Sequence, residues 1–316
     1  MSLSPADLHI LVALRQGRTL AEIGDEMYLT QSAVSRALRL AEQKSGVQLL
    51  ERHGRRLRLT SAGMQLAEQA QNALVQLSEI DRLLEDMQSG RGGRLRLISS
   101  TAPGNYVLPL AVGEFLRTMP GAEVELRVLP PSDMWQTFVE EGYDLAVGPV
   151  GVGPQPVDRG DLAVEALYED ELVFFVAPSS PLAQKPELAW NDVRSQTLIG
   201  PFGEPYWAQL WEHLTHRGFS AAKRVSLLGL EGVKLVVAAG GGVGVIFGAA
   251  VRREVTAGQL VPLRITDLSL PLSYYLVTRR LRQPRPIVDQ FRGLLIRTVR
   301  EFYPVPARRQ ETLPVG

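Results

Sequence analysis

The stretch "LTQSAVSRALRLAEQKSGVQLLERHGRRLRLTSAG", residues 29–63, decides how this chain is interpreted. Its first half has the spacing of an amphipathic helix that begins after Thr30 and ends at Gly46. The apolar side carries Val34, Ala37, Leu38 and Ala41. The opposite side carries amide, hydroxyl and guanidinium groups, on Gln31, Ser32, Ser35, Arg36 and Arg39. Taken alone, this helix fits a solvated surface helix as well as it fits a helix that enters a groove of DNA.

The segments before this helix favour DNA. "PADLHILVALRQG", residues 5–17, and "TLAEIGDEMY", residues 19–28, each have helical apolar spacing, and the second is short. Residues 28–30 are then all that separates it from the polar helix. A short helix, a tight turn and a helix with small buried residues are the spacing of a helix-turn-helix motif.

The segment after the helix favours DNA as well. "VQLLERHGRRLRLTSAG" predicts two short strands, residues 49–52 and 57–60, around a turn at residues 53–56. Such a hairpin is the wing of a winged helix. The whole chain has no net charge, but residues 31–60 contain seven basic and two acidic residues, a local charge of +5. A local basic patch attracts phosphates whatever the total charge is.

Residues 29–63 resemble the LysR-type transcriptional regulators almost without a gap. The chain differs from the usual family pattern at Ile23-Gly24, Ala41 and Leu50, all of which are expected in the core. In this family the positions of Gln31, Ser32, Ser35 and Arg36 face the operator, in agreement with the polar side of the helix. The residues expected to contact DNA are Thr30, Gln31, Ser32, Ser35, Arg36, Arg39, Arg52, Arg55 and Arg56.

A long helix follows from residue 61 to about residue 89. Its apolar residues recur in alternating steps of four and three, at Leu66, Ala70, Ala73, Leu77, Ile80, Leu84 and Met87. This seven-residue repeat is typical of a seam between two helices, so dimerisation is preferred over packing on the chain's own domain. A dimer would present two recognition helices to two half-sites about one DNA turn apart. "SGRGGR", residues 89–94, predicts a hinge.

From residue 94 onward strands alternate with helices, which predicts an α/β domain with largely parallel sheets. The pattern indicates two lobes, residues 94–161 with 268–303 and residues 162–267, joined by crossings near 161–164 and 265–270. This organisation is similar to the periplasmic-binding-protein-like effector domain of the same family. The predicted domains are therefore a winged helix-turn-helix (1–60), a linker and dimerisation helix (61–90), an effector-binding domain (91–304) and a tail (305–316).

A ligand of such a domain is expected between the lobes, near strand ends and helix starts. Ser99, Ser100 and Thr101 stand between a strand and a helix start, where free amides favour an anion. Hydroxyls at this place are also routine helix caps, but the resemblance favours ligand contact. Topology alone adds five further candidates, Gly148, Pro149, Phe202, Leu230 and Glu231.

Other signals predict less. "GGGVG", residues 240–244, lacks the residues of a nucleotide-binding loop, and His213 with His216 fits a surface pair better than a metal site. We therefore expect no catalytic residues, no metal and no cofactor besides a small-molecule effector. The N-terminal sequence resembles no signal peptide and no apolar run could span a membrane, so a cytoplasmic location is expected, with no membrane partner.

The function predicted from the sequence is that of a LysR-type transcriptional regulator, not an enzyme. It would bind double-stranded operator DNA as a dimer of dimers and respond to an effector held between the lobes. RNA polymerase is a further partner that this function allows. The alternative is a small-molecule-binding protein or an α/β enzyme whose basic N-terminal domain is incidental.

Overall fold

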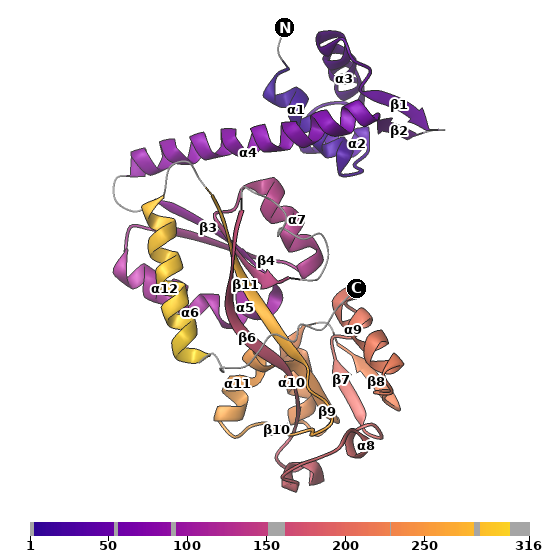
Figure 1. Ribbon diagram of the computed structural model, residues 1–316, viewed down its shortest axis with the longest axis vertical. Helices are drawn as coiled ribbons and strands as arrows, with labels where there is room; N and C mark the ends of the chain where they lie inside the picture. The colour runs from indigo at the N-terminus through magenta and orange to yellow at the C-terminus, as the bar shows by residue number, and fades with distance from the viewer. Residues whose placement is uncertain are drawn as a thin grey trace. The chain divides into compact units, whose positions relative to one another are not determined.

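The computed structural model describes residues 3–53, 56–89, 93–150, 162–227, 229–280 and 285–303. Within these ranges the side chains of residues 52–53, 56, 78–79, 81–83 and 85–89 are not described. The chain divides into two compact units. The first holds residues 1–89, and the second holds nearly all of the remaining chain (Figure 1).

The first unit begins with three helices and a two-stranded hairpin. Helix α1 spans Pro5–Arg15, α2 spans Leu20–Glu26 and α3 spans Gln31–Ser45. Strands β1 (Leu50–His53) and β2 (Arg56–Leu59) pair antiparallel. A shared core holds the elements together, with Ile10 and Leu11 of α1, Ile23 of α2, Val34 and Leu38 of α3, and Leu50 and Leu59 of the hairpin. The predicted helix-turn-helix and wing are therefore both present, with each strand shifted by one residue.

Two glycines set how closely this unit packs. A Cβ atom on Gly24 would lie 2.6 Å from the carbonyl oxygen of Leu29, so α2 and the turn before α3 approach closer than alanine allows. A Cβ on Gly63 would lie 2.2 Å from the carbonyl oxygen of Leu49, where α4 crosses the start of the wing. These are close approaches of backbone to backbone, which only glycine permits without a shift.

Helix α4 spans Ser61–Ser89, the range predicted from the sequence. Thr60 caps its start, because the Thr60 hydroxyl accepts a hydrogen bond from the Gly63 amide at 3.0 Å. At the early positions of the seven-residue repeat, Leu66 packs against the core of the first unit and Ala70 is buried. Leu77, Ile80 and Leu84, further along, are 40%, 55% and 50% exposed. The repeat therefore serves the chain's own core first and leaves an apolar stripe afterwards.

The second unit is a mixed sheet with helices on both faces. The strand order is β4-β3-β5-β11-β6-β9-β7-β8, and β10 pairs with β6. The strands span Arg94–Ser99 (β3), Glu123–Val128 (β4), Leu145–Pro149 (β5), Leu162–Val176 (β6), Thr197–Gly200 (β7), Lys223–Ser226 (β8), Val243–Phe247 (β9), Val261–Leu263 (β10) and Pro271–Arg279 (β11). β3, β4 and β5 pair in parallel, as do β7, β8 and β9. The pairs that involve β6 and β11 are antiparallel, so the sheet is less parallel than predicted.

Lobe 1 consists of β3–β5 with helices α5 (Thr101–Tyr106), α6 (Leu108–Thr118), α7 (Pro131–Glu141) and α12 (Pro286–Phe302). Alternation along β3 sends Leu95 and Leu97 toward the α6 and α12 face and Ile98 toward α7. Lobe 2 consists of β7–β10 with η1 (Pro181–Gln184), α8 (Trp190–Val193), α9 (Pro205–His216), α10 (Leu230–Ala238) and α11 (Gly248–Thr256). Helix α11 was not predicted from the sequence, and Val107 separates α5 from α6.

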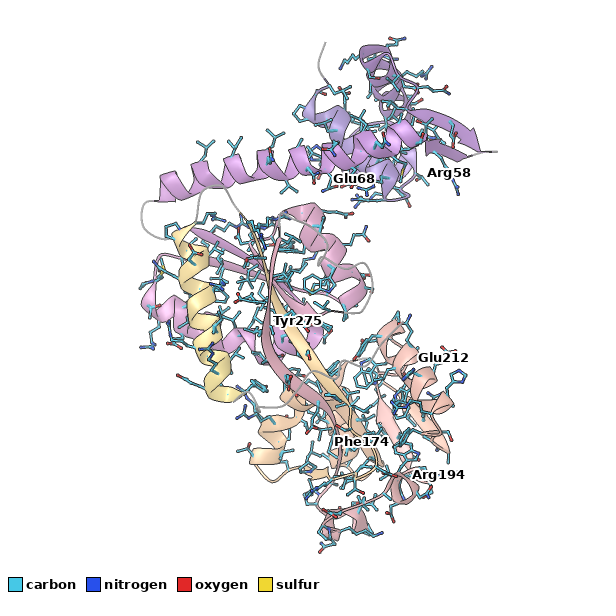
Figure 2. All side chains as sticks on the ribbon, in the orientation of Figure 1. Arg58, Glu68, Phe174, Arg194, Glu212 and Tyr275 are labelled. Carbon is cyan, nitrogen blue, oxygen red and sulfur yellow. The ribbon has the colours of Figure 1, made fainter. Side chains whose placement is uncertain are left out.

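The lobes are joined by two long paired strands. β6 and β11 run side by side through the second unit, with Tyr275 of β11 in lobe 1 and Phe174 of β6 in lobe 2 (Figures 1 and 2). Their register shifts between Tyr274 and Tyr275, where the Tyr168 and Tyr274 rings stack at 4.8 Å. The sequence predicted crossings near 161–164 and 265–270, but continuous strand pairing carries the chain from lobe to lobe.

Candidate nucleic-acid interface and ligand site

The polar face of α3 is assembled by local capping. The Thr30 hydroxyl accepts a hydrogen bond from the Ala33 amide at 3.2 Å and lies 2.9 Å from the Ser32 hydroxyl. The helix ends at Gly46, whose left-handed backbone, with φ +68°, closes the last turn. Thr30 therefore holds the start of the helix, and its hydroxyl is already engaged.

Beyond Thr30, the predicted residues of α3 lie where a partner could reach them. Gln31, Ser32, Arg36 and Arg39 are exposed, and Ser35 is half-buried. Arg39 folds back on Ser35, with Nη2 3.3 Å from the serine hydroxyl and Nε 3.4 Å from its carbonyl oxygen. Among the described residues neither Arg36 nor Arg39 forms an ion pair, so both guanidinium charges are left for an outside partner.

Two charges counted in the basic stretch have inward roles instead. Lys44 forms an ion pair with the buried Asp7 at 2.9 Å and so ties α3 to α1. Glu42 accepts hydrogen bonds from the amides of Leu49 and Leu50, at 2.9 and 3.0 Å, and so ties α3 to the wing. Sequence spacing could not separate these two from the surface charges, because it is compatible with either side of the helix.

Asp7 itself is a well-satisfied carboxylate. Burial acts to raise the pKa of Asp7, but hydrogen bonds from Ser4 and Lys44 outweigh it and hold the pKa below its ordinary value. The Ser4 amide and hydroxyl both lie 2.8 Å from the Asp7 carboxylate. This capping box fixes the start of α1 and, through Lys44, the last turn of α3.

The sequence of the wing carries arginines on both strands. Arg52 on β1 lies opposite Leu57, and Arg56 begins β2. Arg58 lies opposite Glu51 and is exposed, and its side chain projects from the hairpin (Figure 2). Arg55, which was also predicted to contact DNA, lies outside the described residues. The wing and the start of α3 together carry amide, hydroxyl and guanidinium groups, the chemistry that contacts bases and phosphates.

At the predicted ligand site, the three hydroxyls after β3 differ. Ser99 is fully buried, and its hydroxyl donates a hydrogen bond to the Val147 carbonyl oxygen at 2.8 Å. The Ser99 proton therefore supports the β3–β5 pairing, and the predicted ligand contact of this residue stays a prediction. Ser100 is 3% exposed, and its hydroxyl has no partner among the described residues. Thr101 is half-buried at the start of α5.

Three other candidates have packing roles. A Cβ on Gly148 would lie 2.5 Å from Met134 Cε, so this glycine makes room for α7. The Pro149 carbonyl oxygen accepts a hydrogen bond from the Trp135 indole at 2.9 Å, on the same helix. Phe202 packs edge-on against Trp211, with ring centroids 5.2 Å apart. Topology predicted these positions, but the contacts they make are internal.

Leu230 and Glu231 start α10 and also have internal contacts. Leu230 is buried in the core. Glu231 Oε1 accepts a hydrogen bond from the Tyr106 hydroxyl at 2.8 Å and pairs with Lys234 Nζ at 2.8 Å. Burial acts to raise the pKa of Glu231, but the hydrogen bonds from Lys234 and Tyr106 outweigh it and keep the pKa below its ordinary value. Tyr106 ends α5, so this bond connects lobe 1 to lobe 2.

The Tyr106–Glu231 contact belongs to a larger network that the sequence did not predict. Lys234, 6% exposed, donates to Glu254 Oε1 at 2.7 Å and to the Ala250 carbonyl oxygen at 3.0 Å. Its ammonium also lies 5.3 Å from the centre of the Tyr106 ring. A short helix, α5, therefore begins at the Ser100 hydroxyl, which has no partner among the described residues, and ends at a polar bridge between the lobes.

Between the lobes, Asp170 of β6 caps α11. Its carboxylate accepts hydrogen bonds from the amides of Glu171 at 2.9 Å and Ala249 at 3.1 Å. Burial raises the pKa of Asp170 to about 6 despite these bonds. No sequence signal pointed to this residue, because its partner helix was itself not predicted.

Among the described residues, no helix is long and apolar enough to cross a membrane. The described side chains also bring together no group of three or more histidine, aspartate or glutamate residues suited to a metal ion. His213 and His216 are both exposed on α9.

Two family models match the chain. The model for the bacterial regulatory helix-turn-helix protein of the lysR family matches residues 5–64, and the LysR substrate binding domain matches residues 88–300. A probable RuBisCO transcriptional regulator from Synechocystis is 27% identical over 297 residues, covering 90% of this chain and 85% of the relative.

Solved structures share the fold. A full-length OxyR variant from Pseudomonas aeruginosa superposes with a TM-score of 0.62 at 18% identity, covering 98% of this chain and 100% of that one. Full-length CbnR in complex with its target DNA gives a TM-score of 0.55 at 20% identity, covering 93% of this chain and 99% of that one. The match of both family models, one at each end of the chain, leaves the alternative of an incidental basic N-terminus without support.

Proposed function

Because the chain belongs to the LysR family of DNA-binding transcriptional regulators, we propose that it reads its operator with the start of α3. The observation that carries this proposal is the exposed polar end of α3, where Gln31, Ser32 and Arg36 are open to solvent and the Arg36 guanidinium has no ion pair among the described residues. A side chain that must contact bases has to be available in the free protein, and these are.

The chemistry of these groups suits base edges in the major groove. An arginine can donate two hydrogen bonds to guanine, and a glutamine can pair with adenine through its amide. Ser35 and Arg39 contact each other in the free protein. On DNA, Arg39 turns from Ser35 to a phosphate, and the serine hydroxyl becomes available to a base or a phosphate.

The wing contributes the part of binding that does not depend on sequence. Arg58 is exposed, and Arg52 and Arg56 lie on the same two strands. Each arginine that neutralises a phosphate releases counterions, so affinity falls as salt rises. In this proposal α3 supplies operator preference, whereas the wing supplies affinity for the DNA backbone.

The working unit is a dimer formed through α4. Leu77, Ile80 and Leu84, which are three and four residues apart as in a seven-residue repeat, form an exposed apolar stripe. A second copy of α4 would cover this stripe. Pairing of two such dimers gives the tetramer expected from the sequence. The full-length OxyR and CbnR structures, whose folds match this chain over nearly its whole length, support the fold on which this proposed assembly is based.

The second unit senses a small molecule and needs no further cofactor. Ser100 supplies a hydroxyl at the start of α5 that has no partner in the described part of the chain, and Tyr106, at the other end of that helix, bonds to lobe 2. An effector changes DNA binding only by binding one arrangement of the protein more tightly than another. In this proposal the protein acts on DNA in the cytoplasm, with RNA polymerase as a further partner that the function allows.

The proposal is tested by selecting duplexes from a random library with the full-length protein. The affinity for the selected duplex should fall steeply with salt, and Arg36→Ala should cut the preference for it over a scrambled duplex by about tenfold or more. The matched control is Arg194→Ala, an exposed arginine of lobe 2 (Figure 2), which should leave both quantities unchanged. Failure to enrich any duplex, or an unchanged preference in Arg36→Ala, would contradict the assignment.

A further inference from the structure

The turn between α2 and α3 contains a backbone conformation that its residue does not favour. Tyr28 has a φ of +57°, in the left-handed region. Every other described residue with a positive φ is a glycine, including Gly17 and Gly46 in the same unit. A bulky side chain in this region costs on the order of 1 kcal/mol or more.

The fold imposes this conformation on position 28 but does not require a tyrosine there. The Leu29 amide donates to the Gly24 carbonyl oxygen at 2.7 Å, and the missing Cβ of Gly24 lets the turn lie directly on α2. The Tyr28 amide itself makes only a long contact, 3.4 Å, with the Asp25 carbonyl oxygen. A glycine would satisfy the same geometry without strain.

Packing does not compensate for the strain. The Tyr28 side chain is 97% exposed, the most exposed large apolar or aromatic side chain among the described residues. A tyrosine normally buries much of its ring and keeps only its hydroxyl wet. Here the whole ring stands in solvent, so neither the backbone nor the core explains the residue.

The position of Tyr28 identifies a partner. It lies two residues before the Thr30 cap, at the end of α3 where Gln31 and Ser32 are exposed. When the start of a recognition helix enters the major groove, the turn before it meets the sugar-phosphate backbone at the edge of that groove. A phenol can pack on a deoxyribose and donate to a phosphate oxygen, and tyrosine is among the side chains that make phosphate contacts.

We propose that Tyr28 is a DNA-backbone contact, which clamps the sugar and phosphate next to the bases that α3 reads. This inference rests on the proposed DNA-binding function of α3. The proposed Tyr28 contact lies ahead of the helix and is neutral, because the phenol provides a hydrogen bond without a charge. The neighbouring Asp25 is exposed at the same place.

Because the phenol is neutral, the salt dependence of binding distinguishes its loss from the loss of a charged contact. Tyr28→Gly should weaken binding to selected and scrambled duplexes alike, by about tenfold, because a hydrogen bond to a charged phosphate and a ring contact are lost. The slope of affinity against salt should not change, because no charge is removed. Arg58→Ala is the matched comparison, since it should lower the salt slope by about one ion.

Stability separates this contact from a structural role. Tyr28→Gly should leave the melting temperature unchanged or raise it, because strain is relieved and nothing is unpacked. In the wild type, replacing the contacted phosphate of each half-site by a neutral methylphosphonate should lower the affinity for DNA. Tyr28→Phe should keep the fold, but its affinity should not respond to this replacement, because the hydroxyl that donates to the phosphate is gone.

Three outcomes would overturn the inference. They are a Tyr28→Gly affinity within twofold of wild type, a lowered melting temperature in that variant, or transcription lost in vitro with DNA affinity intact, which would assign Tyr28 to a protein partner. In each of these cases Arg36→Ala would still lose operator preference if the proposed function holds. Absence of salt-dependent DNA binding by the wild type would instead remove the proposed function itself.

Discussion

Helices α3 and α5 both begin after a hydroxyl residue, and the two starts differ in every other respect. Thr30 is exposed and caps α3, and the side chains that follow it are open to solvent. Ser100 is buried and makes no cap bond, and Ala102, Pro103 and Gly104 behind it are buried too. The same residue types therefore stand on an open surface in one unit and in a buried place in the other.

The largest expected effect is on the affinity for DNA when only one copy of α3 can bind. Leu77→Asp combined with Ile80→Asp places charge in the exposed stripe of α4 and should convert dimers to monomers. Without a second recognition helix, affinity for a two-half-site duplex should fall by on the order of a hundredfold. Sedimentation and binding titrations measure the two quantities together.

The second unit, which contains α5, should keep its stability in this doubly substituted chain. Melting of the second unit should stay as in wild type, since its folding does not use the stripe. The control is Glu68→Asp, which keeps the charge of an exposed α4 residue and should leave both assembly and affinity in place. A doubly substituted chain that remains dimeric would show that the stripe is not the interface.

A second prediction contrasts the buried carboxylates of the two units. Burial raises the pKa of Asp170 to about 6, above the ordinary 3.8, so between these values the folded protein holds a proton that the unfolded chain releases. The free energy of unfolding of the second unit should therefore fall as pH rises through this window, by at most about 3 kcal/mol. Asp170→Asn should remove that dependence, as measured by denaturant unfolding at pH 4 to 7.

Asp7 in the first unit should behave in the opposite way. Its folded pKa is lowered, so its contribution is present above pH 3.8 and is lost as pH falls below that value. Hydrogen exchange of peptides from α1 and from β6, followed against pH, reads the two units separately. Equal pH dependence in wild type and Asp170→Asn would contradict the role given to burial.

A smaller effect separates neighbouring hydroxyls at the α5 start. Ser99→Ala removes the bond to the Val147 carbonyl and should cost about 1 kcal/mol of stability. Ser100→Ala removes an unpartnered hydroxyl and should cost nothing, but it should weaken any effector found to raise the melting temperature. If Ser100→Ala is as destabilising as Ser99→Ala, Ser100 has an internal partner and is not a ligand contact.

The difference between the two helix starts also explains what the sequence could predict. The α3 surface depends on local periodicity and caps, so spacing alone assigned Val34 and Leu38 to the core and Gln31 and Arg36 to solvent, as the fold has them. The ligand site depends on which strand lies beside which. Without the β3–β5 register, Ser99 could not be distinguished from Ser100, and without α11 neither Asp170 nor the Lys234 network could be found.

Tyr28 marks the limit of local prediction in a different way. Nothing in the spacing around it singles out Tyr28, and only the positive φ and full exposure reveal that the fold does not need it. Glycines 24 and 63 are similar, because their close backbone contacts join segments that sequence spacing does not relate.

Hydrogen exchange of the full-length protein with and without a selected duplex tests the contrast between the two helix starts most directly. Binding should slow exchange in residues 28–39 and in the wing, residues 50–59, far more than in α5, residues 101–106. Protection of α5 with no change in residues 28–39 would contradict the assignment of DNA reading to the start of α3.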